Sequence, residues 1–213
     1  FVLAFFITKA WGLKFSWNLK FVKTSNFQLG SWLLLLGLMI WLIFFNTYLN
    51  IVDTWPELLS FWHWNNYEIS YHFTADILAF SATAGIGEET IRGLEIIALL
   101  YAMRNFKSRI TSAVIISAIL FSLIHLSGLN TITNGTYYSI DMIAQQLTYA
   151  LGFGLIFGVF YLYTGKLWLG MLIHFLIDLE TTSSDESITM FTGWPAAIII
   201  LVVSVLIFGW MLT

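Results

Sequence analysis

The stretch ITMFTGWPAAIIILVVSVLIFGWML, residues 188–212, contains no Asp, Glu, Lys or Arg. A helix needs about 20 mainly apolar residues to cross the hydrocarbon core of a bilayer, and this stretch is long enough. The whole chain has the same character, since 59% of its 213 residues are hydrophobic and 10% are charged; soluble proteins carry about 25% charged residues. A soluble domain of this size would not bury so much apolar surface. We therefore expect an all-α, polytopic transmembrane helical bundle.

The apolar pattern predicts about six spans, namely 31–52, 73–106, 110–126, 140–163, 167–179 and 188–212. Residues 1–8 resemble the end of an earlier span, and the lysine- and aromatic-rich stretch 9–28 resembles an interfacial segment. Alternating spans place all the basic loops on one side of the membrane, as the positive-inside rule requires. We divide the chain into an N-terminal part (1–72), a core (73–180) and a C-terminal span (181–213).

Ionisable side chains occur inside these apolar spans, where they are costly. A charged group near the bilayer centre costs at least about 2.5 kcal/mol on insertion scales, so it must pair or face a cavity, and it marks a functional site by default. The candidate site residues, drawn from three different spans, are Glu88, Glu89, Arg92, His125, His174 and Asp178.

The first polar group is Glu88-Glu89-Thr90-Ile91-Arg92. Glu88 and Arg92 are one helical turn apart and can pair, with Glu89 pointing about 100° away, so that Arg92 would neutralise one carboxylate and leave the other free. Glu95 is an alternative partner for Arg92. The alternative interpretation is that this group is a structural ion pair buried between helices, without a catalytic role.

The other two groups each carry a histidine. Phe121-Ser122-Leu123-Ile124-His125 has an aromatic ring one turn before the imidazole, and His174-Phe175-Leu176-Ile177-Asp178 places two polar groups on one helix face. A carboxylate and an imidazole on facing helices can hold and deprotonate a water molecule. The second His with its Asp can donate to an oxyanion or complete a metal site. The alternatives are that His125 is a hydrogen-bonded histidine at a helix end, and that His174 and Asp178 only support the site or form part of a proton relay.

Composition excludes several other functions. The chain has no cysteine, which rules out disulfides, thiolate metal sites and cysteine nucleophiles. A net charge of −3 without a basic stripe argues against nucleic acid. The expected partners are a peptide or protein substrate at the membrane and the lipid bilayer. His-Glu-x-x-His and Gly-x-Ser-x-Gly motifs are absent. Gly154 and Gly158 predict close packing of their span against a neighbour.

The order Glu-Glu…Arg, Phe-x-x-x-His and His-x-x-x-Asp, with Gly165-Lys166-Leu167-Trp168 before the last motif, resembles the CPBP family. These are the membrane-embedded CAAX proteases and bacteriocin-processing (Abi) proteins, and the resemblance covers residues 79–178. It implies an intramembrane endopeptidase of a bacterial cell membrane that acts on a membrane-associated or lipid-anchored peptide, in bacteriocin immunity or peptide maturation.

The resemblance also implies roles for the candidate residues. Glu88 and His125 would activate the hydrolytic water, Glu89 would help, and His174 with Asp178 would stabilise the oxyanion. The family has been described both as metalloproteases and as metal-free glutamate proteases. In the metal description, a divalent ion such as zinc would be held by Glu88, His125 and His174.

One feature departs from the family pattern. The family has three residues between the second Glu and the Arg, whereas only Thr90 and Ile91 separate Glu89 from Arg92. Aligned on Arg92, the chain has Gly87 at the first glutamate position, so the sequence leaves Glu88 and Glu89 open as the base. Two other classes stay open: a proton-coupled carrier, for which we find no inverted repeat, and a catalytically inactive CPBP-like scaffold.

Overall fold

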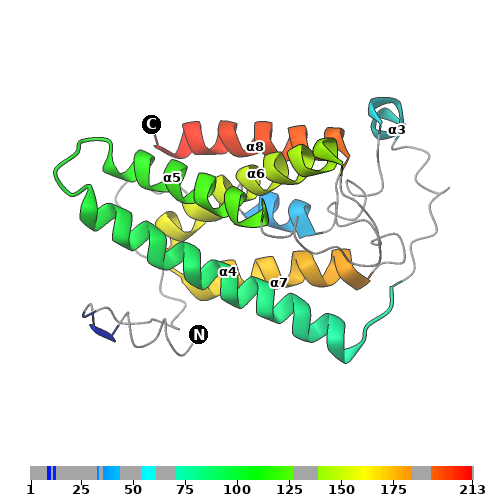
Figure 1. Cartoon of the computed structure of the whole chain (residues 1–213), viewed down its shortest axis with the longest axis horizontal. Coiled ribbons are helices and arrows are strands. Elements are labelled where there is room, and N and C mark those ends of the chain that lie inside the picture. The colour runs from blue at the N-terminus through cyan, green and yellow to red at the C-terminus, as the bar shows by residue number, and fades with distance from the viewer. Residues whose placement is uncertain are drawn as a thin grey trace.

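The structure is a computed structural model that describes residues 9–10, 12, 33, 36–43, 54–60, 71–126, 139–183 and 193–212. The main helices of this part of the chain are α3 (Trp55–Leu59), α4 (Ala75–Ala102), α5 (Arg109–Ile124), α6 (Ile140–Thr164), α7 (Leu167–Ser183) and α8 (Trp194–Leu212). No β-strand occurs among the described residues, so the all-α class is confirmed there. Figure 1 shows α4 to α8 running lengthwise in one bundle.

Each span predicted from residue 73 onward corresponds to one helix, but the number of membrane crossings stays a prediction. Two described helices are long and apolar enough to cross a membrane, Ile140–Thr164 and Trp194–Met211. The shorter helix α5 is also apolar, whereas α4 carries the charged side chains of the first polar group. The predicted span 31–52 lies largely outside the described residues.

Helices α4 and α6 have end residues that satisfy some of their free backbone groups. The Thr74 hydroxyl accepts a hydrogen bond from the Ile77 amide at the start of α4, and the Ser139 hydroxyl does the same for Met142 in α6. Gly165 ends α6 in the left-handed conformation, at φ 61°, which glycine adopts without steric cost. The chain therefore turns within two residues from α6 into α7.

Small residues let α5 and α6 approach closely. A Cβ atom added at Gly154 would lie 2.8 Å from the Cα atom of Ala118, and one added at Gly158 would lie 3.0 Å from the Cγ1 atom of Val114. Helices in lipid associate largely through such van der Waals packing. The predicted packing face at Gly154 and Gly158 is thus confirmed, with α5 as the neighbour.

The bundle carries apolar side chains on its outside and charged ones inside. Ile91 of α4, Ile119 of α5 and Leu206 of α8 are 49%, 44% and 66% exposed, whereas Glu89 and Arg92 are each 1% exposed. Monomeric soluble proteins rarely expose extended apolar patches. The exposed apolar residues extend along α4, α5 and α8, a pattern that suits contact with lipid.

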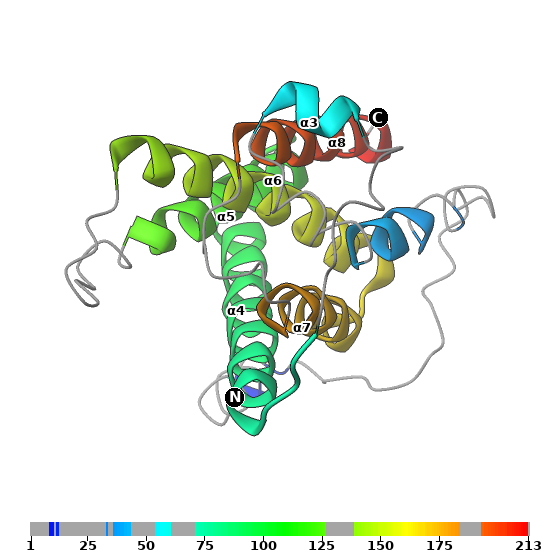
Figure 2. The same cartoon turned by 90° about the vertical axis from the view of Figure 1, so that its right-hand side faces the viewer.

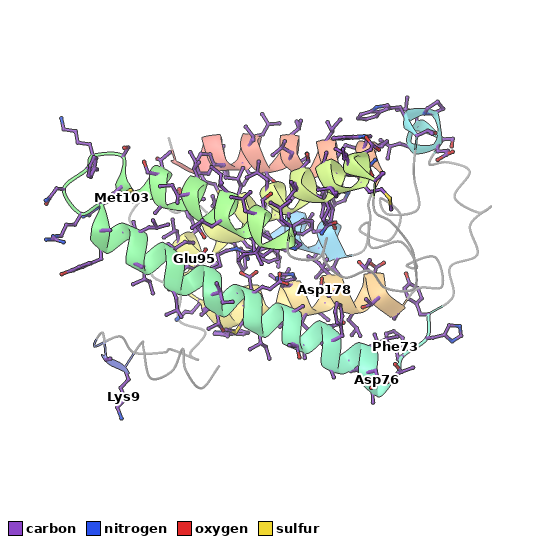
Figure 3. The ribbon with its side chains drawn as sticks, viewed as in Figure 1. Lys9, Phe73, Asp76, Glu95, Met103 and Asp178 are labelled. Atoms are coloured by element: carbon purple, nitrogen blue, oxygen red, sulfur yellow. The ribbon has the colours of Figure 1, made fainter. Side chains whose placement is uncertain are left out.

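The two ends of the bundle differ in charge. Arg104, Lys107 and Arg109 lie around the turn between α4 and α5, at the opposite end of α4 from Asp76 (Figure 3). At the Asp76 end, Tyr71 donates a hydrogen bond to Glu180, which joins the residues before α4 to the end of α7. This separation fits the one-sided distribution of basic loops expected from the sequence.

Candidate active site

Helices α4 and α7 lie side by side because a glycine removes the side chain between them (Figure 2). A Cβ atom at Gly85 would lie 2.7 Å from the Phe175 amide nitrogen and 2.9 Å from the Met171 carbonyl oxygen. A hydrogen bond of 3.2 Å between the Ser81 and Thr182 hydroxyls joins the same two helices. The main chains are therefore close enough for short polar side chains to meet.

A buried chain of three polar side chains crosses from α4 to α7. Arg92 donates through Nη1 to Glu89 Oε1, and the His174 Nδ1 atom lies 2.8 Å from the same oxygen. Glu89 and Arg92 are each 1% exposed and His174 is 8% exposed. Removing charges from water is costly unless they are paired and hydrogen-bonded, and the Glu89 carboxylate meets this condition on both sides.

Arg92 pairs with Glu89 and not with Glu88, the partner that the helical spacing also allowed. Positions three and four residues apart on a helix are both within reach of a side chain, so spacing alone did not choose between Glu89 and Glu88. The position of α7 decides, because Glu89 is on the buried side of α4 with Gly85 and Arg92, whereas the Glu88 side chain is 36% exposed.

The Nε2 atom of His174 faces two further carboxylates. It lies 3.7 Å from Glu88 Oε2 and 3.6 Å from Asp178 Oδ2, and these side chains are 36% and 24% exposed. The two distances are longer than those of hydrogen bonds, so Nε2 forms a full hydrogen bond with neither carboxylate. The predicted proximity of His174 and Asp178 is confirmed, and Figure 3 marks Asp178 on α7. The histidine thus presents one nitrogen to a buried orienting group and the other to a more exposed acidic opening.

Aromatic rings surround the guanidinium of Arg92. Its Cζ atom lies 4.0 Å from the ring centroid of Phe121 in α5 and 5.3 Å from that of Phe157 in α6. Within the described part of the chain, the Nε and Nη2 atoms of Arg92 have no hydrogen-bond partner. The electron-rich ring faces attract a cation, and more strongly where water is excluded. Arg92 is therefore held by one carboxylate and two rings.

His125 lies at the end of α5 and contacts its own helix. Its Nδ1 atom is 2.9 Å from the Phe121 carbonyl oxygen, and its ring makes an edge contact with the Phe121 ring at a centroid distance of 4.9 Å. A carbonyl oxygen only accepts, so Nδ1 donates and Nε2 keeps its lone pair in the neutral ring. Among the described residues, no hydrogen bond or ion pair joins His125 to Glu88 or His174.

The three residues proposed from the sequence as metal ligands do not come together. No group of three or more His, Asp or Glu side chains within the described ranges is arranged to hold a metal ion. Of Glu88, His125 and His174, only the first and last approach each other. The donor set expected from the sequence therefore does not fit a metal ion.

The structure adds residues that the sequence did not single out. Ser117 of α5 donates to Glu95 over 3.1 Å, so Glu95 is tied to α5 in place of its expected alternative partner, Arg92. Phe157 contacts both Arg92 and His174. Phe157 lies in an uninterrupted apolar stretch of α6, and no signal in the sequence marks it.

The described helices thus expose apolar side chains on their outside and bury the Arg92–Glu89–His174 chain between them. A protein-family model described as type II CAAX prenyl endopeptidase Rce1-like matches residues 70–179, which are 110 of the 213 residues. The chain belongs to this family of membrane-embedded proteases, and the resemblance drawn from the three motifs is confirmed. Comparison with curated proteins gave no significant match, and neither did comparison with solved structures.

Proposed function

We propose that the protein is an intramembrane endopeptidase that hydrolyses a peptide bond of a membrane-associated or lipid-anchored peptide. The observation that carries the proposal is the buried Arg92–Glu89–His174 chain, which leaves His174 Nε2 beside Glu88 and Asp178. A histidine oriented through one nitrogen by a carboxylate, with the other nitrogen directed at an opening, is an arrangement suited to proton transfer in amide hydrolysis.

Glu88 is the water-activating carboxylate in this proposal. Glu88 is the more exposed of the two adjacent glutamates and its Oε2 lies 3.7 Å from His174 Nε2, whereas Glu89 is committed to Arg92 and His174. The water oxygen forms a bond to the scissile carbonyl carbon while Glu88 takes up the proton. The family resemblance implies a helper role for Glu89, and in this proposal that role is to orient His174.

His174 stabilises the negative oxygen that forms on the carbonyl. In this step His174 carries a proton on both nitrogens: Nδ1–H donates to Glu89, and Nε2–H donates to the oxyanion, with Asp178 beside it. When the carbon–nitrogen bond breaks, the departing amine takes the proton held by Glu88. The water has then been divided between the new carboxylate and the new amine.

His125 keeps its expected role as a second group on the hydrolytic water. Support comes from its tautomer, because the Nδ1–H bond to the Phe121 carbonyl leaves Nε2 able to accept a proton. The approach of His125 to Glu88 rests on the family resemblance alone.

The biological role that we propose is bacteriocin immunity or peptide maturation in a bacterial cell membrane. This role rests on the CPBP resemblance and not on a contact in the structure. We further propose that the site works with Glu88 as a glutamate base, since the expected metal ligands do not gather among the described residues.

The proposal is tested with the full chain in detergent and a library of peptides, including peptides with a lipidated end. Cleavage by the wild type is compared with that by Glu88→Gln, Glu89→Gln, His125→Ala and His174→Ala, each with and without a chelator. Asp76→Asn is the matched control, because Asp76 is an exposed acid in the first turn of the same helix as Glu88.

Cleavage that disappears in Glu88→Gln and His174→Ala but persists in Asp76→Asn and in the presence of chelator supports the proposal. Loss of cleavage with chelator, restored by zinc, would contradict the metal-free base. A folded wild type that cleaves no peptide would contradict the peptidase proposal and favour the scaffold or the carrier.

A further inference from the structure

Phe157 is the side chain through which α6 reaches both charged partners of Glu89. It is fully buried in α6. Its ring is stacked on the His174 imidazole, with centroids 5.2 Å apart and planes 19° apart, and the Arg92 Cζ atom lies 5.3 Å from its centroid. One apolar residue on a third helix thus contacts the donor groups on both sides of the Glu89 carboxylate.

We propose that Phe157 is a positioning residue that sets the plane of the His174 imidazole. With that plane set, Nδ1 meets Glu89 while Nε2 faces Glu88 and Asp178. The inference rests on the proposed function for its catalytic consequence, but the position of the imidazole can be measured without any substrate.

Two constraints are needed to orient an imidazole, and Glu89 supplies only one. The Nδ1–H bond to Glu89 Oε1 fixes the direction of one ring nitrogen, but the ring plane can still turn through small, coupled changes in the two side-chain torsions. Rotation would carry Nε2 away from the two carboxylates. A nearly parallel ring at stacking distance opposes this rotation, because aromatic pairs gain about 0.5–1.5 kcal/mol from a preferred geometry.

The surroundings of Phe157 favour this role. A Cβ atom at Gly170, one turn before His174, would lie 3.5 Å from Glu89 Oε2 and 3.9 Å from Phe157 Cδ1. Glu89 and Phe157 therefore both lie at contact distance beside Gly170, on the same side of α7. Phe153, one turn earlier in α6, stacks on Phe157 with centroids 5.9 Å apart.

Phe153 also provides a matched control. Its described ring contacts are with Tyr149 and Phe157 and not with His174, and it is 5% exposed in the same helix. Phe153→Leu and Phe157→Leu make the same chemical change one turn apart. Phe157→Tyr keeps the ring and completes the set.

The experiment records the side-chain ¹⁵N signals of histidine in the full chain in detergent. The chain has four histidines, so the His174 signals are assigned by their loss in His174→Ala. In Phe157→Leu we expect the Nε2 signal of His174 to shift, because that nitrogen moves away from the two carboxylates it faces, while Phe153→Leu and Phe157→Tyr leave it unchanged. On a cleaved peptide, Phe157→Leu should lower kcat about three- to tenfold at nearly constant KM and displace the pH profile of kcat.

Unchanged His174 signals in folded Phe157→Leu would overturn the inference, and so would equal shifts in Phe153→Leu. A shift confined to Phe157→Leu in a protein that cleaves no peptide would sustain the positioning of His174 while contradicting the proposed peptidase. The two proposals can therefore fail separately.

Discussion

His174 and His125 are both oriented by a bond at Nδ1, but the groups that accept this bond differ. Both imidazoles have Nδ1 bonded and leave Nε2 for chemistry. His174 donates to a buried carboxylate that Arg92 neutralises, whereas His125 donates to a backbone carbonyl of its own helix. The orientation of His174 depends on three helices, α4, α6 and α7; the described contacts of His125 are within α5 and its end.

The difference shows which parts of the site a mutation can disturb at a distance. A charged orienting group fixes both the tautomer and the electrostatic environment of His174, and its removal leaves a buried guanidinium without a counter-ion. A backbone carbonyl can fix only the tautomer, and no side-chain substitution removes it. We therefore expect His174 to respond to changes in its neighbours and His125 to respond mainly to its own replacement.

The largest effect is expected for His174 itself. His174→Ala removes the oxyanion donor and the partner of Glu89, so kcat for a cleaved peptide should fall about 10³-fold. His72→Ala is the control, because His72 is exposed and precedes α4. Initial rates from peptide mass spectrometry measure the effect; a His174→Ala rate within tenfold of the wild type would remove His174 from the chemistry.

Glu89→Gln should come next, since it breaks the buried chain. Removing one partner of a buried ion pair costs about 3–5 kcal/mol, so we expect a lower free energy of unfolding along with a lower kcat. The double variant Glu89→Gln/Arg92→Met removes the stranded charge and should recover stability without activity. Denaturation in detergent measures this, and a double variant as unstable as the single one would speak against the buried pair.

His125→Ala should lower kcat about 100-fold, as expected for loss of a general base. The ring ¹⁵N signals of His174 should stay unchanged, because no described contact joins the two histidines. A shift of those signals would show that the two regions are coupled. Undiminished cleavage by His125→Ala would show that the reaction needs only the side chains of α4 and α7.

The smallest effects are expected for Gly85 and Gly87, which lie two residues apart in α4 and have different surroundings. Gly85→Ala forces a methyl group against the backbone of α7 and should cost about 1–3 kcal/mol of stability. Gly87→Ala meets nothing within 4 Å and should stabilise the helix by about 0.5–1 kcal/mol. Paired thermal unfolding measures both, and equal effects would refute the close approach of α4 and α7.

The same contact clarifies the departure from the family motif. Position 87, where alignment on Arg92 would place the first glutamate, has open space in front of it, whereas Gly85 and Glu89 face α7. The shortened spacing puts Arg92 three residues after Glu89, which is within reach on a helix. The carboxylates that meet His174 are therefore Glu88 and Glu89, as the motif order suggests.

Sequence alone predicted the helices of the core well and the partners of the charged groups less well. The runs that became α4 to α7 are bounded by polar or capping residues such as Ser139 and Gly165, so their boundaries were visible. The partner of Arg92 depended on where α7 lies, which helix spacing does not encode. Phe157 was not predictable because its role depends on contact with two other helices.

The central claim, that Glu88 activates water for peptide hydrolysis, is tested most directly by comparing Glu88→Gln with Asp76→Asn. Both variants remove one carboxylate from α4, and the full chain in detergent is given a peptide that the wild type cleaves. We expect Glu88→Gln to lose cleavage by about 10³-fold while staying folded, and Asp76→Asn to cleave at the wild-type rate. Cleavage by Glu88→Gln at the wild-type rate would contradict this claim.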